Sequence, residues 1–248
     1  MKKTDSLWYQ AMPEQFISSD QIHVWRAFLD LNSLEIRSLS GTLSSDEVAK
    51  AERFRFEKDK KKFIVARGIL RRILGRYVGK DPHELRFEYT ANGKPILVNS
   101  ESGALSFNLS HSATFALYAV TLQKNIGIDI ERIRYDIDVA EIARRFFSQE
   151  EVNSLESIHE NKLHELFFRY WTRKEAFLKA TGDGISFPME KIDVSLINGR
   201  ILSPVRLPDN KRENTNWYVQ DLFPGEGYAA AIAVEEAHCN LSHFDYSI

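Results

Sequence analysis

The sequence predicts an α+β fold built from two similar halves, each with one long helix and several strands. Two amphipathic helices are predicted, at Lys58–Tyr77 and Leu163–Ala180, and each is followed by strand-like runs. The segment before each helix also repeats loosely, because Arg53–Phe56 (RFRF) returns as Arg145–Phe147 (RFF). Such a repeat indicates a duplicated unit. We therefore divide the chain near Lys124 into an N-terminal half (1–123) and a C-terminal half (124–248).

The N-terminal half is expected to start with mixed strands and loops over about forty residues. Apolar residues recur at helical spacing from Phe63 to Tyr77, and Gly79 and Pro82 end that helix. Asn92–Gly93 indicates a tight turn. The other predicted elements are a strand beginning at Ile22–Trp25, a helix capped by Ser44 or Ser45, and strands at Leu85–Tyr89, Leu105–Leu109 and Ala116–Leu122.

The C-terminal half opens with a strand over Asn125–Glu131, in which Ile126, Ile128 and Ile130 take alternate positions. Thr181–Gly184 breaks the long helix of this half. The remaining predicted elements are a helix at Val139–Phe147 and strands near Ile192–Leu196, Trp217–Val219 and Tyr228–Val234.

The composition is that of a globular protein. With 43% apolar and 27% charged residues among 248, a disordered or collagen-like chain is excluded. Cys239 is the single cysteine, so an internal disulfide is impossible and a reducing, cytoplasmic setting is expected. We expect neither a membrane span nor a secretory signal, because no apolar run approaches about 18 residues and none follows the N-terminal lysines.

Positive charge is concentrated in one segment of the chain. Lys50–Lys80 contains twelve Lys or Arg residues against three acidic ones, a local charge of +9 in a chain whose formal net charge is −2. An excess of this kind attracts phosphate, nucleic acid or an acidic protein. The alternative is an ordinary solvated helix face.

Two carboxylates stand at alternate positions of one predicted strand. Asp129 and Glu131 would project from the same face, while Ile128 and Ile130 are buried on the other. Neighbouring carboxylates repel each other unless a cation lies between them, and oxygen ligands suit Mg²⁺. The alternative is a polar strand face without a ligand.

A third acidic residue lies on the second long helix. Glu175 and Lys179 are four residues apart and so share one helix face, beside an apolar stripe. From there Glu175 could reach a cleft as a third metal ligand or a general base. The alternative is a surface ion pair.

Other common catalytic motifs are missing from the sequence. Ser110 and His111 are expected in a turn after a strand, and as adjacent residues they do not suit the geometry of a catalytic triad. His159 and His164 are spaced one residue too far apart for the His-Glu-x-x-His zinc motif. Neither a P-loop nor a Gly-x-Gly-x-x-Gly fingerprint occurs, so the use of ATP or NAD is not indicated.

Taken together, these segments resemble one enzyme family. Asn108–Ser112 (NLSHS), Ile126–Glu131 (IGIDIE) and Trp171–Lys179 (WTRKEAFLK) occur in the order and spacing of the broad-specificity, surfactin-type 4′-phosphopantetheinyl transferases. Gly93–Pro95, Arg145–Phe147 and Gly182–Gly184 also fit that pattern, which spans about residues 50 to 200.

The resemblance implies a fold, an activity and its substrates. The fold is a pseudo-dimer of two α/β halves, each a small, mainly antiparallel sheet packed on a long helix, with the ligand between them. The enzyme transfers the 4′-phosphopantetheine arm of coenzyme A to a serine of an apo acyl or peptidyl carrier protein and releases 3′,5′-ADP. It depends on Mg²⁺, with Mn²⁺ as the alternative metal. We expect a monomer that binds neither nucleic acid nor membrane.

The resemblance also implies roles for individual residues. Asp129, Glu131 and Glu175 correspond to the metal ligands, and Glu175 also to the base that activates the carrier serine. Lys179 corresponds to the proton donor or charge stabiliser at the leaving phosphate. The expected coenzyme A contacts are Lys94, Ser110, His111, Arg53, Arg67 and Lys174.

Two other functions are compatible with the residues themselves. The same carboxylates could serve a Mg²⁺-dependent hydrolase that releases phosphate or ADP from coenzyme A without a carrier. The basic helix could instead belong to a non-enzymatic module that binds nucleic acid or an acidic protein in a salt-sensitive manner.

Overall fold

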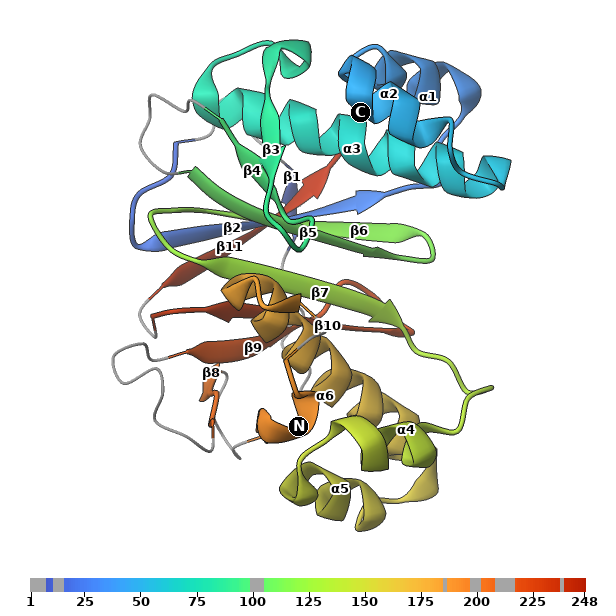
Figure 1. Ribbon diagram of the computed structural model, residues 1–248, viewed down its shortest axis with the longest axis vertical. Coiled ribbons are helices and arrows are strands. Elements are labelled where there is room, and N and C mark those ends of the chain that lie inside the picture. Colours follow the sequence, from blue (N-terminus) through green and yellow to red (C-terminus); the bar gives the residue numbers. More distant parts are fainter. Residues whose placement is uncertain are drawn as a thin grey trace.

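The computed structural model describes residues 8–10, 16–98, 105–184, 187–196, 202–207, 217–236 and 239–248. Two sheets lie face to face in the middle of the molecule, and one long helix covers the outer face of each (Figure 1). The expected α+β class with two similar halves is confirmed. The expectation about a secretory signal concerns the N-terminal residues 1–7 and 11–15, which are outside the described part of the chain.

The N-terminal half contains one long helix and most of a five-stranded sheet. The sheet has the order β1-β11-β2-β6-β5, in which β2, β6 and β5 are antiparallel neighbours. The elements of this half are β1 (Tyr9–Gln10), β2 (Gln21–Phe28), α1 (Ser33–Ser40), α2 (Ser45–Ala51), α3 (Glu57–Val78), the short 3₁₀ turn η1 (Pro82–Glu84), β3 (Phe87–Tyr89), β4 (Pro95–Leu97), β5 (Leu105–Ser112) and β6 (Phe115–Leu122). Strands β3 and β4 form a separate hairpin.

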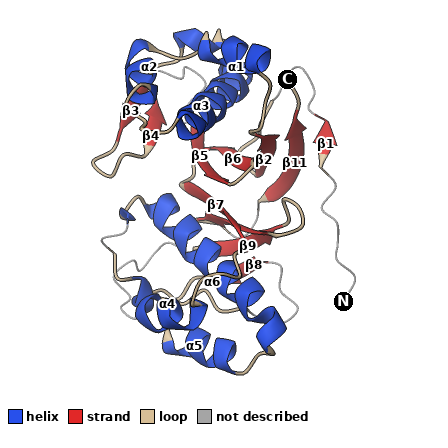
Figure 2. Ribbon diagram, turned by 90° about the vertical axis from the view of Figure 1, so that its right-hand side faces the viewer, coloured by secondary structure: helices blue, strands red, loops and turns tan. Residues whose placement is uncertain are grey.

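The C-terminal half repeats this plan with a four-stranded antiparallel sheet, in the order β7-β10-β9-β8. Its elements are β7 (Ile126–Arg132), α4 (Val139–Phe146), α5 (Gln149–Glu156), α6 (Glu160–Thr181), the 3₁₀ turn η3 (Met189–Lys191), β8 (Leu202–Pro204), β9 (Tyr218–Leu222) and β10 (Tyr228–Val234). Helices α3 and α6 are both 22 residues long and lie on opposite outer faces (Figure 2).

The last strand, β11 (Asn240–Tyr246), crosses back to the other half. It pairs in parallel with β2 and β1 and so belongs to the N-terminal sheet. Residues 124–248 therefore do not all pack within the C-terminal half. The boundary near Lys124 itself stays a prediction.

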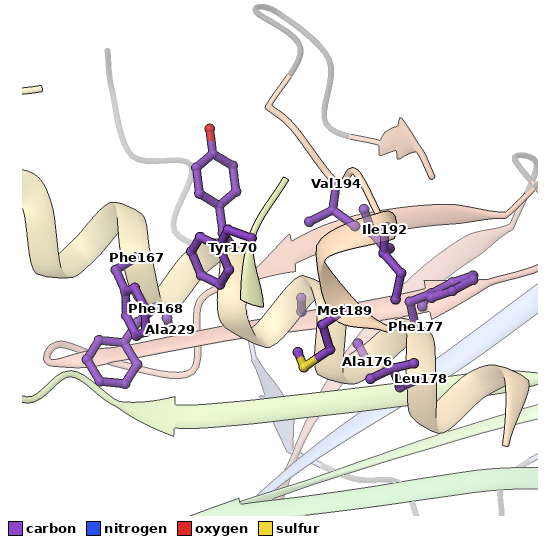
Figure 3. Close-up of a cluster of buried hydrophobic side chains, with 14 of the residues drawn as sticks. Phe167, Phe168, Tyr170, Ala176, Phe177, Leu178, Met189, Ile192, Val194 and Ala229 are labelled. Carbon is purple, nitrogen blue, oxygen red and sulfur yellow. The ribbon is translucent and has the colours of Figure 1, made fainter. Parts of the chain in front are cut away.

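Both sheets are buried on both faces, and the described residues form three hydrophobic cores. Helix α3 packs on Trp25 and Tyr118 of the first sheet, while Val24 of that sheet faces Ile128 and Ile232 of the second. The third core lies between α6 and the second sheet. Figure 3 shows Ala176, Phe177 and Leu178 of α6 beside Met189, Ile192 and Val194. No helix in the described ranges is long and apolar enough to cross a bilayer.

Some local predictions were wrong. Residues 33–40 form a helix rather than strand or loop, because Asn32 and Glu35 cap it reciprocally. Ser110 and His111 lie within β5 rather than in a turn, since pairing with β6 continues through Ser112. Of the strand expected near Ile192, only an isolated bridge between Asp193 and Arg206 forms.

Candidate active site

The candidate site lies where β5, β7 and α6 meet. Helix α6 approaches β7 closely because Gly127 has no side chain; a Cβ there would stand 2.0 Å from the carbonyl oxygen of Ala176. Asp129 and Glu131 follow Gly127 at alternate positions and so face the same helix. The close approach brings Glu175 and Lys179 of α6 to the two strand carboxylates.

Asp129 is held by two partners from different halves of the molecule. Its Oδ1 lies 2.6 Å from Lys179 Nζ of α6 and accepts a hydrogen bond of 2.8 Å from Ser110 Oγ of β5. Lys179 Nζ also donates to Ser110 Oγ at 2.9 Å. The carboxylate is 3% exposed, and its Oδ2 is buried without a hydrogen-bond partner in the described part of the chain. One oxygen of this group is therefore available to a further ligand.

A ladder of side chains from β5 holds β7 in place. Ser112 Oγ donates to Glu131 Oε2 at 2.7 Å and accepts from the backbone N–H of Arg132 at 3.0 Å. Ser110, two residues earlier on β5, bonds to Asp129 as described above. Asn108, two residues earlier again, accepts a hydrogen bond at its Oδ1 from the backbone N–H of Ile128 at 2.9 Å. These contacts connect the edge of the N-terminal sheet to the strand that carries both carboxylates.

The carboxylates of Glu131 and Glu175 are held in a setting that disfavours their charge. Burial raises the pKa of Glu175, and the negative charges of Asp129 and Glu131 raise it further, while Lys179 opposes them. Burial likewise raises the pKa of Glu131, against a hydrogen bond from Ser112 that lowers it. The three acidic side chains therefore share one electrostatic environment with an excess of negative charge.

This donor set fits a hard divalent cation in its chemistry. Its donor atoms are all oxygens, and the flanking carboxylates repel each other. One of these oxygens is buried and has no hydrogen-bond partner within the described ranges. In the described residues, however, no three His, Cys, Asp or Glu side chains are already arranged around a common metal position. Asp129, Glu131 and Glu175 are thus brought to one place, but they do not form a finished coordination shell.

Of the expected coenzyme A contacts, Ser110 and His111 lie beside this region on β5, whereas Arg53 lies at another cavity. The pKa of His111 on β5 is lowered, first by loss of hydration and then by the positive charges of Lys179 and Lys62. Arg53 is exposed and lines a cavity of about 760 Å³ together with Lys50, Phe54 and Tyr89. Cations and aromatic rings therefore line this cavity of the N-terminal half.

Arg67 and Lys174 were expected to contact coenzyme A, but both are buried in structural ion pairs. Arg67 pairs with Glu47, which also binds Arg71 at 2.5 Å, and Arg67 is 5% exposed. Lys174 is fully buried, 2.7 Å from Glu151, and donates to two backbone carbonyls. The structure does not support a ligand contact for either residue, because their charged groups are enclosed by protein.

Lys94 also differs from the expectation. Its ammonium points at the backbone carbonyls of Lys179, Ile126 and Ala180 in the C-terminal half, at 2.7, 3.2 and 3.4 Å. It lines a second cavity of about 240 Å³ that Glu175 and Lys179 also line. Lys94 therefore lies at the site, although its donors are directed at the protein.

Three residues of the site were not singled out from the sequence: Asn108, Ser112 and Gly127. A signal for the first two was present, because polar side chains occupy every second position from Asn108 to Ser112. On a strand this places them on one face with Ser110. For Gly127 the signal was a glycine between two isoleucines of a strand, because a glycine inside a strand often marks the close approach of another backbone.

Comparisons with known proteins show the family to which the chain belongs. A family model described as "4'-phosphopantetheinyl transferase superfamily" matches residues 125–233, and one described as "4'-phosphopantetheinyl transferase, N-terminal" matches residues 32–123. The 4′-phosphopantetheinyl transferase HetI of Nostoc sp. PCC 7120 is 42% identical over 92% of this chain and 93% of its own.

Two further relatives have related names. A putative 4′-phosphopantetheinyl transferase of Synechocystis sp. PCC 6803, slr0495, is 39% identical over 77% of this chain and 78% of its own. The 4′-phosphopantetheinyl transferase Sfp of Bacillus subtilis is 30% identical over 77% of this chain and 81% of its own. Enzymes of this family use coenzyme A as a substrate and act on apo carrier proteins. The chain therefore belongs to the 4′-phosphopantetheinyl transferase superfamily and is an enzyme that transfers the phosphopantetheine arm to carrier proteins.

Proposed function

We propose that Asp129, Glu131 and Glu175 hold one divalent cation, Mg²⁺ or Mn²⁺, and that transfer takes place beside it. The observation that carries the proposal is the buried Oδ2 of Asp129, which has no hydrogen-bond partner among the described residues and lies next to two carboxylates with raised pKa values. A bound divalent ion would neutralise the pyrophosphate of coenzyme A and polarise it towards attack. The donors would close around the ion by small side-chain movements.

In the transfer step, a serine hydroxyl of the carrier attacks the β-phosphorus of coenzyme A. The new serine O–P bond forms as the bond between that phosphorus and the bridging oxygen of 3′,5′-ADP breaks. Glu175 takes the serine proton, a role that its raised pKa supports. Lys179, which in the free protein pairs with Asp129, offsets the charge that grows on the departing phosphate.

The nucleotide of coenzyme A is assigned to the cavity of about 760 Å³. The exposed cations Lys50 and Arg53 would bind its 3′-phosphate, and the rings of Phe54 and Tyr89 would contact the adenine. The arm would continue past Gly93, which borders both cavities, towards Glu175. Ser110 and His111 would contact the phosphates that join the nucleotide to the arm.

The proposal includes a monomer that acts in the cytoplasm on an acyl or peptidyl carrier, without nucleic acid or membrane as partner. In support of a monomer, one chain supplies β5 from its first half and β7 and α6 from its second, so both sides of the site are present. In support of a reducing compartment, Cys239 is the single cysteine.

The test is one incubation of the enzyme with coenzyme A, Mg²⁺ and an apo carrier, with mass spectrometry of the carrier. The wild-type enzyme should add one phosphopantetheine, and the D129N, E131Q and E175Q variants should lose at least about 10²-fold in rate. A parallel thermal melt should show stabilisation by Mg²⁺ in the wild type and none in D129N. If all three variants keep Mg²⁺-dependent activity, the assigned roles are wrong. ADP released without a carrier would instead indicate hydrolysis.

A further inference from the structure

The turn of the β3–β4 hairpin reaches out of the N-terminal half and touches the end of α6. The hairpin leaves the N-terminal half on the side where α6 ends (Figure 2). Within the turn, Gly93 has φ 78° and its N–H donates to the carbonyl of Thr90 at 2.8 Å. The Thr90 hydroxyl in turn accepts from the N–H of Lys94 at 3.1 Å. The turn is therefore internally braced and presents Asn92 and Lys94 outward.

Both of these side chains bind backbone carbonyls that α6 leaves open at its C-terminus. The last four carbonyls of a helix lack partners within the helix. Lys94 Nζ donates to the carbonyl of Lys179 at 2.7 Å and, at a longer 3.4 Å, to that of Ala180. Asn92 Nδ2 donates to the carbonyl of Gly182, the residue that ends the helix, at 2.6 Å. A cation at this end of a helix is also favoured by the helix dipole.

No donor of Lys94 is left over for a ligand. An ammonium group has three N–H donors, and the third is directed at the carbonyl of Ile126 at the start of β7, at 3.2 Å. Burial lowers the pKa of Lys94 to about 8. The group that the sequence suggested as a phosphate contact is thus committed to the protein.

We propose that the Asn92–Lys94 turn is a clasp that fixes the C-terminal end of α6, and with it Glu175 and Lys179, against the N-terminal half. Lys94 is then a positioning residue that acts through the backbone of Lys179 and not a ligand of coenzyme A. The inference rests on the proposed function for the roles of Glu175 and Lys179. It is supported by the place of the turn, because Gly93 borders both the large cavity and the small one.

The test compares K94M, K94R and N92A with the wild type, with K80M as a control at an exposed lysine of the same half. Hydrogen exchange of the amides from Lys179 to Gly182 is measured on the protein alone. K94M should speed exchange of this last turn about tenfold, and N92A should do so to a smaller extent, since each removes contacts to its carbonyls. K80M should leave it unchanged, and K94R should restore part of the protection.

Steady-state kinetics distinguish a positioning role of Lys94 from direct binding of coenzyme A. K94M should lower kcat about tenfold and change KM for coenzyme A less than about twofold, because a misplaced Lys179 affects the transition state rather than substrate binding. N92A should also lower kcat, although Lys94 itself is unchanged in this variant. Unchanged exchange in K94M together with a KM raised about tenfold would overturn the proposal and make Lys94 a coenzyme A contact. The exchange result stands on its own even if the assigned catalytic roles are wrong.

Discussion

At the residue scale, the acidic groups of the site are placed where their charge costs stability. Asp129 offers one oxygen to Lys179 and Ser110, and its other oxygen is buried without a partner in the described residues. Glu131 and Glu175 have raised pKa values because burial and their neighbours' charges oppose ionisation. In functional sites of this kind, the arrangement that activity requires lowers the stability of the folded protein.

The first prediction concerns E175Q, which should lose transfer activity and gain stability. A carboxyl whose pKa is raised above its ordinary 4.5 in the folded state favours folding while it is protonated, at low pH. It loses that contribution as the pH rises through the folded-state pKa. At pH 7, neutral Gln should therefore increase the free energy of unfolding, by up to about 1 kcal/mol.

The measurement is urea unfolding of the wild type and E175Q at pH 7 and pH 4. The gain should disappear at pH 4, where the wild-type carboxyl also becomes neutral. E165Q is the matched control, because Glu165 is an exposed residue of the same helix. Equal stability of the wild type and E175Q at pH 7 would contradict the account of the strained carboxylate.

The second prediction is the pH dependence of the rate. If Glu175 accepts the serine proton, its carboxyl must be ionised in the free enzyme. Its pKa is raised in the metal-free protein, and a bound cation would lower it again. The acid limb of kcat/KM should therefore lie above 4.5, the ordinary value for Glu, at limiting Mg²⁺ and move to lower pH as Mg²⁺ is raised. Profiles measured at limiting and at saturating Mg²⁺ check this, and an acid limb that does not move with Mg²⁺ would argue against Glu175 as a base beside the metal.

At the element scale, α6 is placed by its contact with β7, and a single glycine allows that contact. The third prediction is that G127A destabilises the protein by about 2–3 kcal/mol and reduces transfer, because its new Cβ would displace the helix backbone at Ala176. G41A is the control, since the nearest atom to its Cβ would be 3.6 Å away and its φ is −66°. Urea midpoints that coincide for the two variants would show that the helix is not held this tightly.

The fourth prediction concerns the buried pair that joins α5 to α6. Lys174 and Glu151 are both fully buried, and Glu151 also accepts from the backbone N–H of Val194 at 2.9 Å. K174M should lower the free energy of unfolding by about 3–5 kcal/mol, because it leaves a carboxylate buried without its counter-charge.

The double variant K174M/E151Q separates charge from packing. It should recover part of the lost stability at pH 7, because no buried charge remains at this pair. Burial already raises the pKa of Glu151, so the loss in K174M should be smaller at pH 5, where this carboxyl takes up a proton more readily. Denaturant titrations at the two pH values test this. A loss that is equal at both would show that packing, rather than the unpaired charge, is responsible.

Local pattern predicted most elements but not all residue roles. Apolar periodicity located α3 and α6 closely, because both carry a continuous buried stripe. It could not show that Lys174 and Arg67 face the interior. Their partners, Glu151 and Glu47, are about 20 residues away in the chain, and the pairs form only through tertiary packing. The carboxylates were more accessible to prediction because strand alternation alone puts Asp129 and Glu131 on one face.

At the scale of the whole molecule, the two halves share a core and a strand. The middle core is built from both sheets, and β11 returns from the C-terminal end to pair with β2. This return could not be predicted from the sequence, because a parallel pairing between segments more than 200 residues apart leaves no local signal. The side-chain ladder from β5 to β7 adds polar contacts at the edge of the same interface.

A shared core implies that the halves unfold together. The last prediction is that I232A, in the C-terminal sheet, and V24A, in the N-terminal sheet, each lower a single melting transition of the whole molecule. Both side chains are at most 1% exposed and lie in the middle core, so truncation removes contacts between the halves. Ile→Ala in a core costs about 2–5 kcal/mol, with a smaller loss for Val→Ala.

The control is I96A. Ile96 is 50% exposed, so this variant should change the free energy of unfolding by less than about 0.5 kcal/mol. Calorimetry decides the question: equal calorimetric and van't Hoff enthalpies in the variants would show one cooperative unit, whereas a second transition appearing in I232A alone would mean that each half is stable without the other.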